Sequence, residues 1–219
     1  MKNSPLLTIY EDPTEVSSLF VERLIVRLET HYPDITPHRI FNHHTPNNSW
    51  LIHGIKQVQA ACPQGVFRLV HHLKEEMHYR KNMITWEDLE DCVFGMGLNL
   101  QYKEGDWDSG FSRVPILHLE NRDEVVIDTS SNQEFFAKIE SFKKLSPLTE
   151  ENLVALFKRN ERLTWDELLF VYQEQKEALP SLIKHLSIGK VLKLGRLGST
   201  ILIKTPAKTY CCEGNECDC

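Results

Sequence analysis

The sequence predicts a helix-rich α+β fold in which short β-hairpins close small helical units that are repeated in tandem. Between residues 149 and 188, apolar side chains recur every three or four positions, which is the period of an amphipathic helix. After Gly189 the period falls to two, which indicates a pair of short strands around a glycine-bearing turn. The segment Ile84–Leu89 is similar to Leu163–Leu168 in residue type, and this similarity predicts a second unit between residues 61 and 130.

Local signals place three helices in the C-terminal unit. Thr149 can cap the first helix, whose opening turn carries acidic residues that suit the positive end of the helix dipole. Thr164 and Glu167 have the spacing of a capping box at the start of the second helix. The third helix is expected from Glu177 to Ser187, and Gly189 fits its end.

The third helix and the hairpin together carry a resemblance to a known family. The pattern Leu182-Ile183-x-x-Leu186-x-x-Gly189-x-Val191, followed by the hairpin, resembles that of winged helix-turn-helix domains over about residues 149–207, within a predicted domain of residues 149–208. Such domains bind nucleic acid and also bind other proteins. The resemblance implies that the third helix would enter the major groove of a duplex, while the hairpin, or wing, would touch the backbone.

Charge favours a polyanion as one kind of partner for this region. Residues 180–208 hold six basic side chains and no acidic one, although the chain carries 25 basic and 31 acidic residues and a net charge of -6. The third helix lacks arginine, asparagine and glutamine, which argues against base-specific recognition. We expect a protein that binds duplex nucleic acid, most of all DNA. The alternatives are an adaptor that binds a protein partner and a metal sensor or buffer that acts through a C-terminal thiol tail. The expected nucleic-acid-binding residues are Ser181, Lys184, His185, Lys190, Lys193, Arg196 and Lys204.

The rest of the chain divides by pattern into three segments before the C-terminal unit. Residues 1–60 are expected to form an N-terminal helical segment. Residues 61–130 are expected to form a degenerate winged-helix unit with an enlarged hairpin, whose strands lie near Val114–Leu119 and Val125–Asp128. Residues 131–148 are expected to be a helical connector.

Four of the six cysteines lie in the tail formed by residues 209–219. The tail has too little apolar mass to bury them, and four thiolates can hold Zn²⁺ or another thiophilic metal. Disulfide formation, a lipid anchor and a tail without a defined role are the other interpretations. The expected metal ligands are Cys211, Cys212, Cys217 and Cys219.

Two further groups of polar residues have spacings that occur in metal or catalytic sites. His71, Glu75 and His78 share one helical face, but a di-iron bundle needs a second Glu-x-x-His that the chain lacks, so an exposed polar face is expected. The Asp106–Asp108 segment has an Asp-x-Asp form that can hold Mg²⁺, yet it falls in an expected hairpin loop. No glycine-rich phosphate loop or Gly-x-Ser-x-Gly elbow occurs, so a non-catalytic protein is expected.

The chain lacks the signals of membrane insertion and of secretion. No apolar run approaches the ~18 residues that a membrane-spanning helix needs. The first residues contain acids and no apolar region typical of a secretory signal. An intracellular protein, cytoplasmic or nuclear, without a membrane partner is therefore expected.

Overall fold

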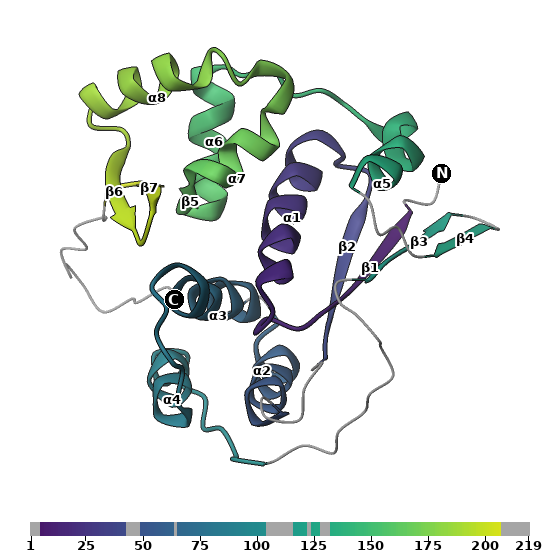
Figure 1. The fold of residues 1–219 in the computed structure, drawn as a ribbon, viewed down its shortest axis with the longest axis vertical. Coiled ribbons are helices and arrows are strands. Elements are labelled where there is room, and N and C mark those ends of the chain that lie inside the picture. Colours follow the sequence, from purple (N-terminus) through teal and green to yellow (C-terminus); the bar gives the residue numbers. More distant parts are fainter. Residues whose placement is uncertain are drawn as a thin grey trace, which may run out of the picture.

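The computed structural model describes residues 5–42, 49–63, 65–103, 116–121, 124–127 and 132–206. The fold is α+β and rich in helix, as predicted, and these residues form one four-stranded and one three-stranded sheet. They also form three hydrophobic cores, each of which belongs to a separate group of elements. We call these groups the N-terminal unit, the helical insertion and the C-terminal unit. Helix α1 (Leu19–His31) belongs to the N-terminal unit and lies between the strands of that unit and the other two units (Figure 1).

The N-terminal unit is a four-stranded sheet packed against two helices. The parallel strands β1 (Leu6–Glu11) and β2 (Thr36–Phe41) are joined by the 3-10 turn η1 (Val16–Ser18) and α1. The hairpin of β3 (Ile116–Asn121) and β4 (Glu124–Ile127) pairs with β1, which gives the order β2-β1-β3-β4. Helix α5 (Asn132–Ile139) and the 3-10 turn η4 (Glu140–Phe142) follow the hairpin. The core of the unit includes Leu7, Ile9, Leu24, Leu28, Tyr32, Leu117, Phe135 and Ile139.

Two predictions about domain organisation are wrong in this part of the chain. Residues 1–60 do not form a helical segment only, because the strands β1 and β2 flank α1. The hairpin predicted to close a winged-helix unit within residues 61–130 instead joins the N-terminal sheet, where Leu119 of β3 lies opposite Leu7 of β1. Pairing between strands so far apart in sequence leaves no local signal. The segment 131–148 contains a helix as predicted, but its buried side chains belong to the core of this unit and not to a linker.

The order of the strands in the N-terminal unit does not by itself assign a function.

The helical insertion connects β2 to β3 and has a core of its own. Its elements are α2 (Ser49–Ala61), α3 (Gly65–Lys74), the π-helical turn η3 (Glu75–Tyr79) and α4 (Trp86–Phe94). Thr85 begins α4 with a capping box, as its similarity to Thr164 suggested. The repeated motif therefore marks two helix starts and not two copies of a domain. The core of the insertion includes Phe41, Leu51, Ile55, Leu69, Val70, Leu73, Leu89 and Val93.

The C-terminal unit contains the three predicted helices and the predicted hairpin. The first two helices are α6 (Glu150–Asn160) and α7 (Trp165–Val171), capped by Thr149 and by the Thr164–Glu167 capping box. The third is α8 (Leu179–Ile188), which the 3-10 turn η5 (Gln173–Gln175) precedes. The strands are β5 (Arg162–Thr164), β6 (Lys193–Leu197) and β7 (Thr200–Lys204), in the order β5-β7-β6. The short strand β5 was not predicted.

The C-terminal unit is fastened to both other units. Val26 of α1 lies in the C-terminal core, and the Arg27 guanidinium donates a 2.6 Å hydrogen bond to the Phe170 carbonyl. At the tip of the hairpin, Gly198 has a φ of 58° and lies against the backbone of Tyr79 in η3, where any Cβ atom would overlap the Tyr79 carbonyl. The wing is therefore docked on the insertion. Within the described part of the chain, no helix has the length and apolar character needed to cross a bilayer.

Candidate functional site

The outer face of α8 carries the predicted groove-facing residues. Leu179, Ile183 and Leu186 point into the core, and this leaves Ser181, Lys184 and His185 exposed, as the helical period predicted. The His185 imidazole lies 3.7 Å from the Glu150 carboxylate, which is also exposed. An acid from α6 therefore lies beside this face, although the segment 180–208 itself contains none.

The hairpin and the turn before it carry the remaining predicted residues, and all of them are exposed. Lys193 of β6 lies directly opposite Lys204 of β7, and Arg196 lies opposite Ile201. Lys190 lies in the turn after α8 and has a φ of 58°. Like charges directly opposite each other destabilise a sheet unless a counter-charge is present. The Lys193–Lys204 pair is thus a place where an anionic group of a partner would stabilise the molecule.

Four exposed aliphatic side chains lie among these basic residues. Ile188 at the end of α8 is 73% exposed, and Val191, Leu194 and Ile201 are 38%, 53% and 45% exposed. Sequence periodicity assigned Val191, Leu194 and Ile201 to the paired strands without showing which of them would be covered. Leu194 is exposed because it lies on the edge strand β6, whereas its cross-strand partner Ile203 on the central strand β7 is buried. We call the exposed residues of α8, the following turn and the hairpin the α8–wing surface.

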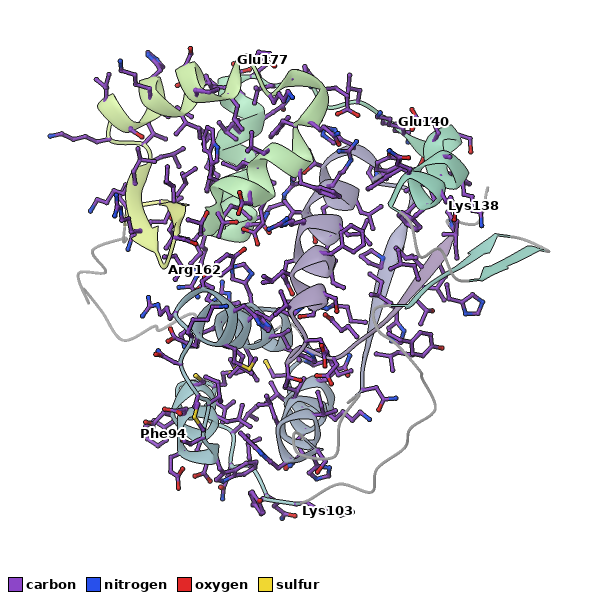
Figure 2. All side chains as sticks on the ribbon, in the orientation of Figure 1. Phe94, Lys103, Lys138, Glu140, Arg162 and Glu177 are labelled. Atoms are coloured by element: carbon purple, nitrogen blue, oxygen red, sulfur yellow. The ribbon has the colours of Figure 1, made fainter. Side chains whose placement is uncertain are left out.

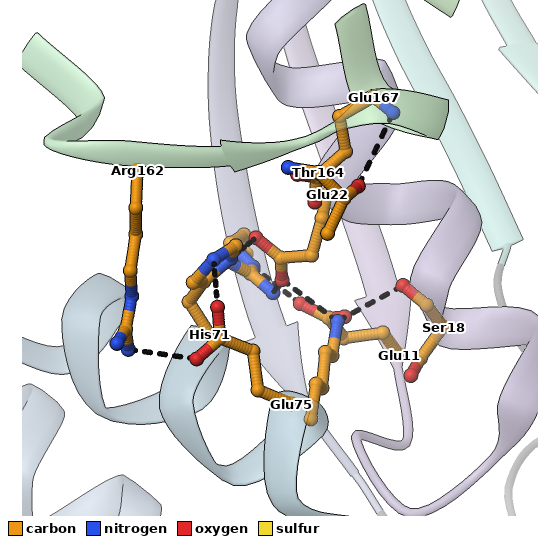
Figure 3. Close-up of polar contacts among 10 residues, drawn as sticks. Glu11, Ser18, Glu22, His71, Glu75, Arg162, Thr164 and Glu167 are labelled. Carbon is orange, nitrogen blue, oxygen red and sulfur yellow. Dashed lines mark hydrogen bonds and ion pairs between the residues drawn. The ribbon is translucent and has the colours of Figure 1, made fainter. Parts of the chain in front are cut away.

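A second notable group lies buried where the three units meet (Figure 3). Arg39 donates to Glu11 and, at 2.6 Å, to Glu22, and the Lys74 ammonium lies 2.7 Å from Glu11 and 2.8 Å from Glu22. This tetrad joins β1, α1, β2 and α3. It was not predicted, because its members come from four separate elements and no sequence spacing relates them.

The buried tetrad continues into the C-terminal unit through His71. The His71 ring lies 3.6 Å from Glu22 and 3.3 Å from Glu75, and Arg162 of β5 lies 2.9 Å from the other oxygen of Glu75. Figures 2 and 3 show Arg162 extending from β5 towards α3. With Glu167, which lies nearby at the start of α7, this ionic cluster contains four carboxylates and four cations. It comprises Glu11, Glu22, Glu75, Glu167, Arg39, His71, Lys74 and Arg162.

The ionisation of the cluster follows from its contacts. Burial favours a neutral Glu22, but Arg39 and Lys74 outweigh this effect and hold the pKa of Glu22 well below its usual value. Burial also opposes protonation of His71, yet its contacts with Glu22 and Glu75 raise the pKa of His71 to about 10. The imidazole is therefore a cation at neutral pH. Burial raises the pKa of Glu167, so this carboxyl is less readily ionised than that of Glu22. The cluster is suited to holding the units together, because each of its four cations contacts a carboxylate from another element.

The prediction that His71, Glu75 and His78 form an exposed polar face is wrong. Glu75 and His78 are buried, and the His78 ring contacts the Pro13 carbonyl at 2.9 Å. The helix lies against both α1 and β5, so its polar face is an interface between units. Among the described residues, no group of three or more potential ligands has the geometry of a metal site.

A cleft of about 720 Å³ lies beside the ionic cluster, between α1, α3 and β5. Its apolar wall includes Ile25, Val26 and Leu163. Its charged side chains are largely paired, as in the Arg68–Glu161 contact of 2.8 Å at its rim. The charged residues that line it are mixed in sign, so they do not select one class of ligand. The α8–wing surface is therefore the better candidate site.

Two sequence predictions lie outside the described residues. These are the metal site at Cys211, Cys212, Cys217 and Cys219 and the Asp106–Asp108 segment. The two cysteines that the structure describes, Cys62 and Cys92, are free thiols.

Comparison of the sequence with known protein families and curated proteins finds no match. The function must therefore be argued from the residues themselves.

Proposed function

We propose that this chain is a non-catalytic adaptor whose C-terminal unit is a winged helix that docks a protein partner through the α8–wing surface. The element order helix, strand, helix, helix, hairpin supports the winged-helix assignment, with β5 as the third strand of its sheet. The free thiols Cys62 and Cys92 suit a reducing compartment, so the location proposed with this function is the cytoplasm or the nucleus.

The observation that carries the proposal is the exposed aliphatic group within a basic surrounding. Ile188, Val191, Leu194 and Ile201 lie within fourteen positions of one another, and each leaves a substantial apolar area in water. Protein interfaces combine an apolar centre with a polar rim, whereas nucleic-acid interfaces are mainly polar and strongly basic. A protein partner with apolar side chains would cover these residues, and a phosphate backbone would not.

The docked wing also favours a protein partner. Gly198 at the wing tip lies against Tyr79, so the tip is already occupied by the insertion. A wing that grips a duplex needs its tip free to reach the backbone. The open parts of the wing are instead the side of β6 and the residues that precede it.

A duplex nucleic acid is the second candidate, and one specific observation favours it. All seven predicted binding residues are exposed, and no acidic residue occurs between positions 180 and 208. This arrangement gives the surface a positive potential in an otherwise acidic chain. The seven residues are Ser181, Lys184, His185, Lys190, Lys193, Arg196 and Lys204.

One pair of measurements distinguishes the two candidates. A photo-crosslinking amino acid placed at position 194 should capture a discrete protein in cells, whereas the same group at position 145 should not. Leu145 is the matched control, since it is also 53% exposed and lies in the segment before α6, away from the wing. The adaptor proposal requires that the crosslink at position 194 disappear when Ile201 is replaced by aspartate.

The second measurement is an anisotropy titration with duplex and single-stranded probes at about 50 mM and about 200 mM salt. The adaptor proposal expects weak binding to both. Tight duplex binding that falls steeply with salt and is lost in a Lys193→Glu/Arg196→Glu variant would replace the adaptor proposal with the nucleic-acid one.

A further inference from the structure

Strand β6 is an open edge of the C-terminal sheet. In the described part of the chain it pairs with β7 alone, and its first four residues, Lys193–Arg196, are exposed. An edge strand presents backbone N–H and C=O groups that can pair with another extended segment. Proteins commonly block such edges with charged residues, and Lys193 and Arg196 fit that role. The exposed Leu194 between them does not, because an apolar residue makes an edge more adhesive.

The register of the hairpin fixes which side chains a partner strand would meet. Cross-strand pairs share a face, so Lys193 and Lys204 lie on one face of the hairpin. Leu194, Arg196 and Ile201 lie on the other face, because successive residues of a strand alternate. The first face also holds Leu197 and Leu202, but both are buried. Among the exposed side chains, a strand added beside β6 would therefore meet mainly lysine on one face and mainly aliphatic side chains on the other. Acidic and apolar residues in alternation would match both.

We infer that β6 binds an extended, acidic segment of a partner protein by β-strand addition, with acidic and aliphatic residues alternating in the segment. This inference rests on the proposed adaptor function and specifies its partner. Backbone pairing with β6 would give affinity, and the side chains on the two faces would give selectivity. A second copy of this chain fits less well, because a β6–β6 contact would bring together two Lys193 and two Arg196 side chains without an acid.

The fixed position of the wing supports binding at this edge. Gly198 lies against Tyr79 at the tip, and Arg162 of the same sheet is paired with Glu75 at 2.9 Å. The sheet is thus held by the insertion before a partner arrives. A binding edge that is already ordered loses little conformational entropy on association.

A decapeptide of five Glu-Val repeats, blocked at both ends and labelled with a fluorophore, tests the inference by anisotropy against the full chain. We expect saturable binding, and no binding of the matching Lys-Val decapeptide. Two analogues then probe the backbone, one N-methylated at every valine and the other at every glutamate. In a strand, the N–H groups of alternate residues point to the same side. One analogue should therefore lose about tenfold or more in affinity, since its pairing N–H groups are gone, while the other keeps most of it.

Variants of the chain locate the contact. Leu194→Asp should weaken peptide binding by about tenfold, and the equally exposed Leu145→Asp should leave it unchanged. Circular dichroism of both variants shows whether they are folded.

The possible outcomes distinguish failure of the strand-addition inference from failure of the proposed adaptor function. If the Glu-Val peptide does not bind, or if both N-methylated analogues bind like the parent peptide, strand addition to an acidic segment is refuted. The adaptor proposal then still stands on the crosslink at position 194. If Leu194→Asp is folded and leaves the peptide affinity unchanged, and if the crosslink at position 194 also survives Ile201→Asp, the inference and the proposed function both fail.

Discussion

Replacing Lys74 with methionine should destabilise the fold more than any surface substitution of a lysine. Lys74 is 1% exposed, and its ammonium contacts Glu11 at 2.7 Å, Glu22 at 2.8 Å and the Ser18 carbonyl at 3.0 Å. Methionine fills a similar volume without the charge. The two buried carboxylates would then share Arg39 as their main counter-ion, and loss of one partner from a buried ion pair costs about 3–5 kcal/mol.

Urea unfolding at pH 7 measures this loss, with Lys56→Met as the control. Lys56 is exposed on α2, so its replacement should change the free energy of unfolding by less than about 0.5 kcal/mol. Without Lys74 the pKa of Glu22 rises, and the folded variant takes up a proton more readily than the unfolded chain. The difference from the native protein should therefore shrink as the pH falls from 7 towards 5.

A double variant tests the electrostatic origin of the effect. Adding Glu11→Gln to Lys74→Met removes one of the uncompensated carboxylates, so the double variant should be more stable than Lys74→Met alone. If Lys74→Met costs less than about 1 kcal/mol, or if Glu11→Gln lowers its stability further, the reasoning from buried charge is wrong.

Three further predictions concern other parts of the molecule. His71 has a folded-state pKa of about 10 against an ordinary value of 6.5, so its stabilising effect is complete below pH 6.5 and is lost as the pH rises through 10. Unfolding midpoints measured from pH 6 to 10 should thus fall more steeply for the native chain than for His71→Gln, and parallel curves would contradict the assignment. Gly198→Ala should cost on the order of 1–3 kcal/mol in thermal unfolding, because of its positive φ and its contact with Tyr79, while Gly95→Ala, which has open space around it, should be nearly neutral. An equal effect at both glycines would mean that the wing tip is not docked. Elemental analysis should find a thiophilic metal in the native protein and less of it in a variant whose four tail cysteines are replaced by serine; these are Cys211, Cys212, Cys217 and Cys219. Equal metal content in the two proteins would exclude the tail as the metal site.

The C-terminal unit was predictable because its signals are local. The capping residues Thr149 and Thr164 and the change of period after Gly189 lie within or next to the elements that they define. Strand β5 was missed because three residues are too few to show a period. The N-terminal sheet was missed because β1 and β2 are short and find their partners through α1 and across the whole insertion.

The candidate site was predictable only in part, for a related reason. Helical periodicity placed Lys184 and His185 on the outside of α8. It could not show that Leu194 would be exposed, since that depends on which strand forms the edge of the sheet. The ionic cluster was not predictable, because Glu22 and Lys74 have no relation in sequence and meet only in the folded chain.

The pairing of Glu75 with Arg162 has a consequence for how the molecule could be divided. A cut in the exposed segment between η4 and α6 would leave the carboxylate on one fragment and the guanidinium on the other. Each fragment would also expose part of an apolar contact, since Val26 packs into the core of the other. The two fragments should consequently recombine when mixed. Their affinity for each other would directly measure how strongly the C-terminal unit binds the rest of the molecule.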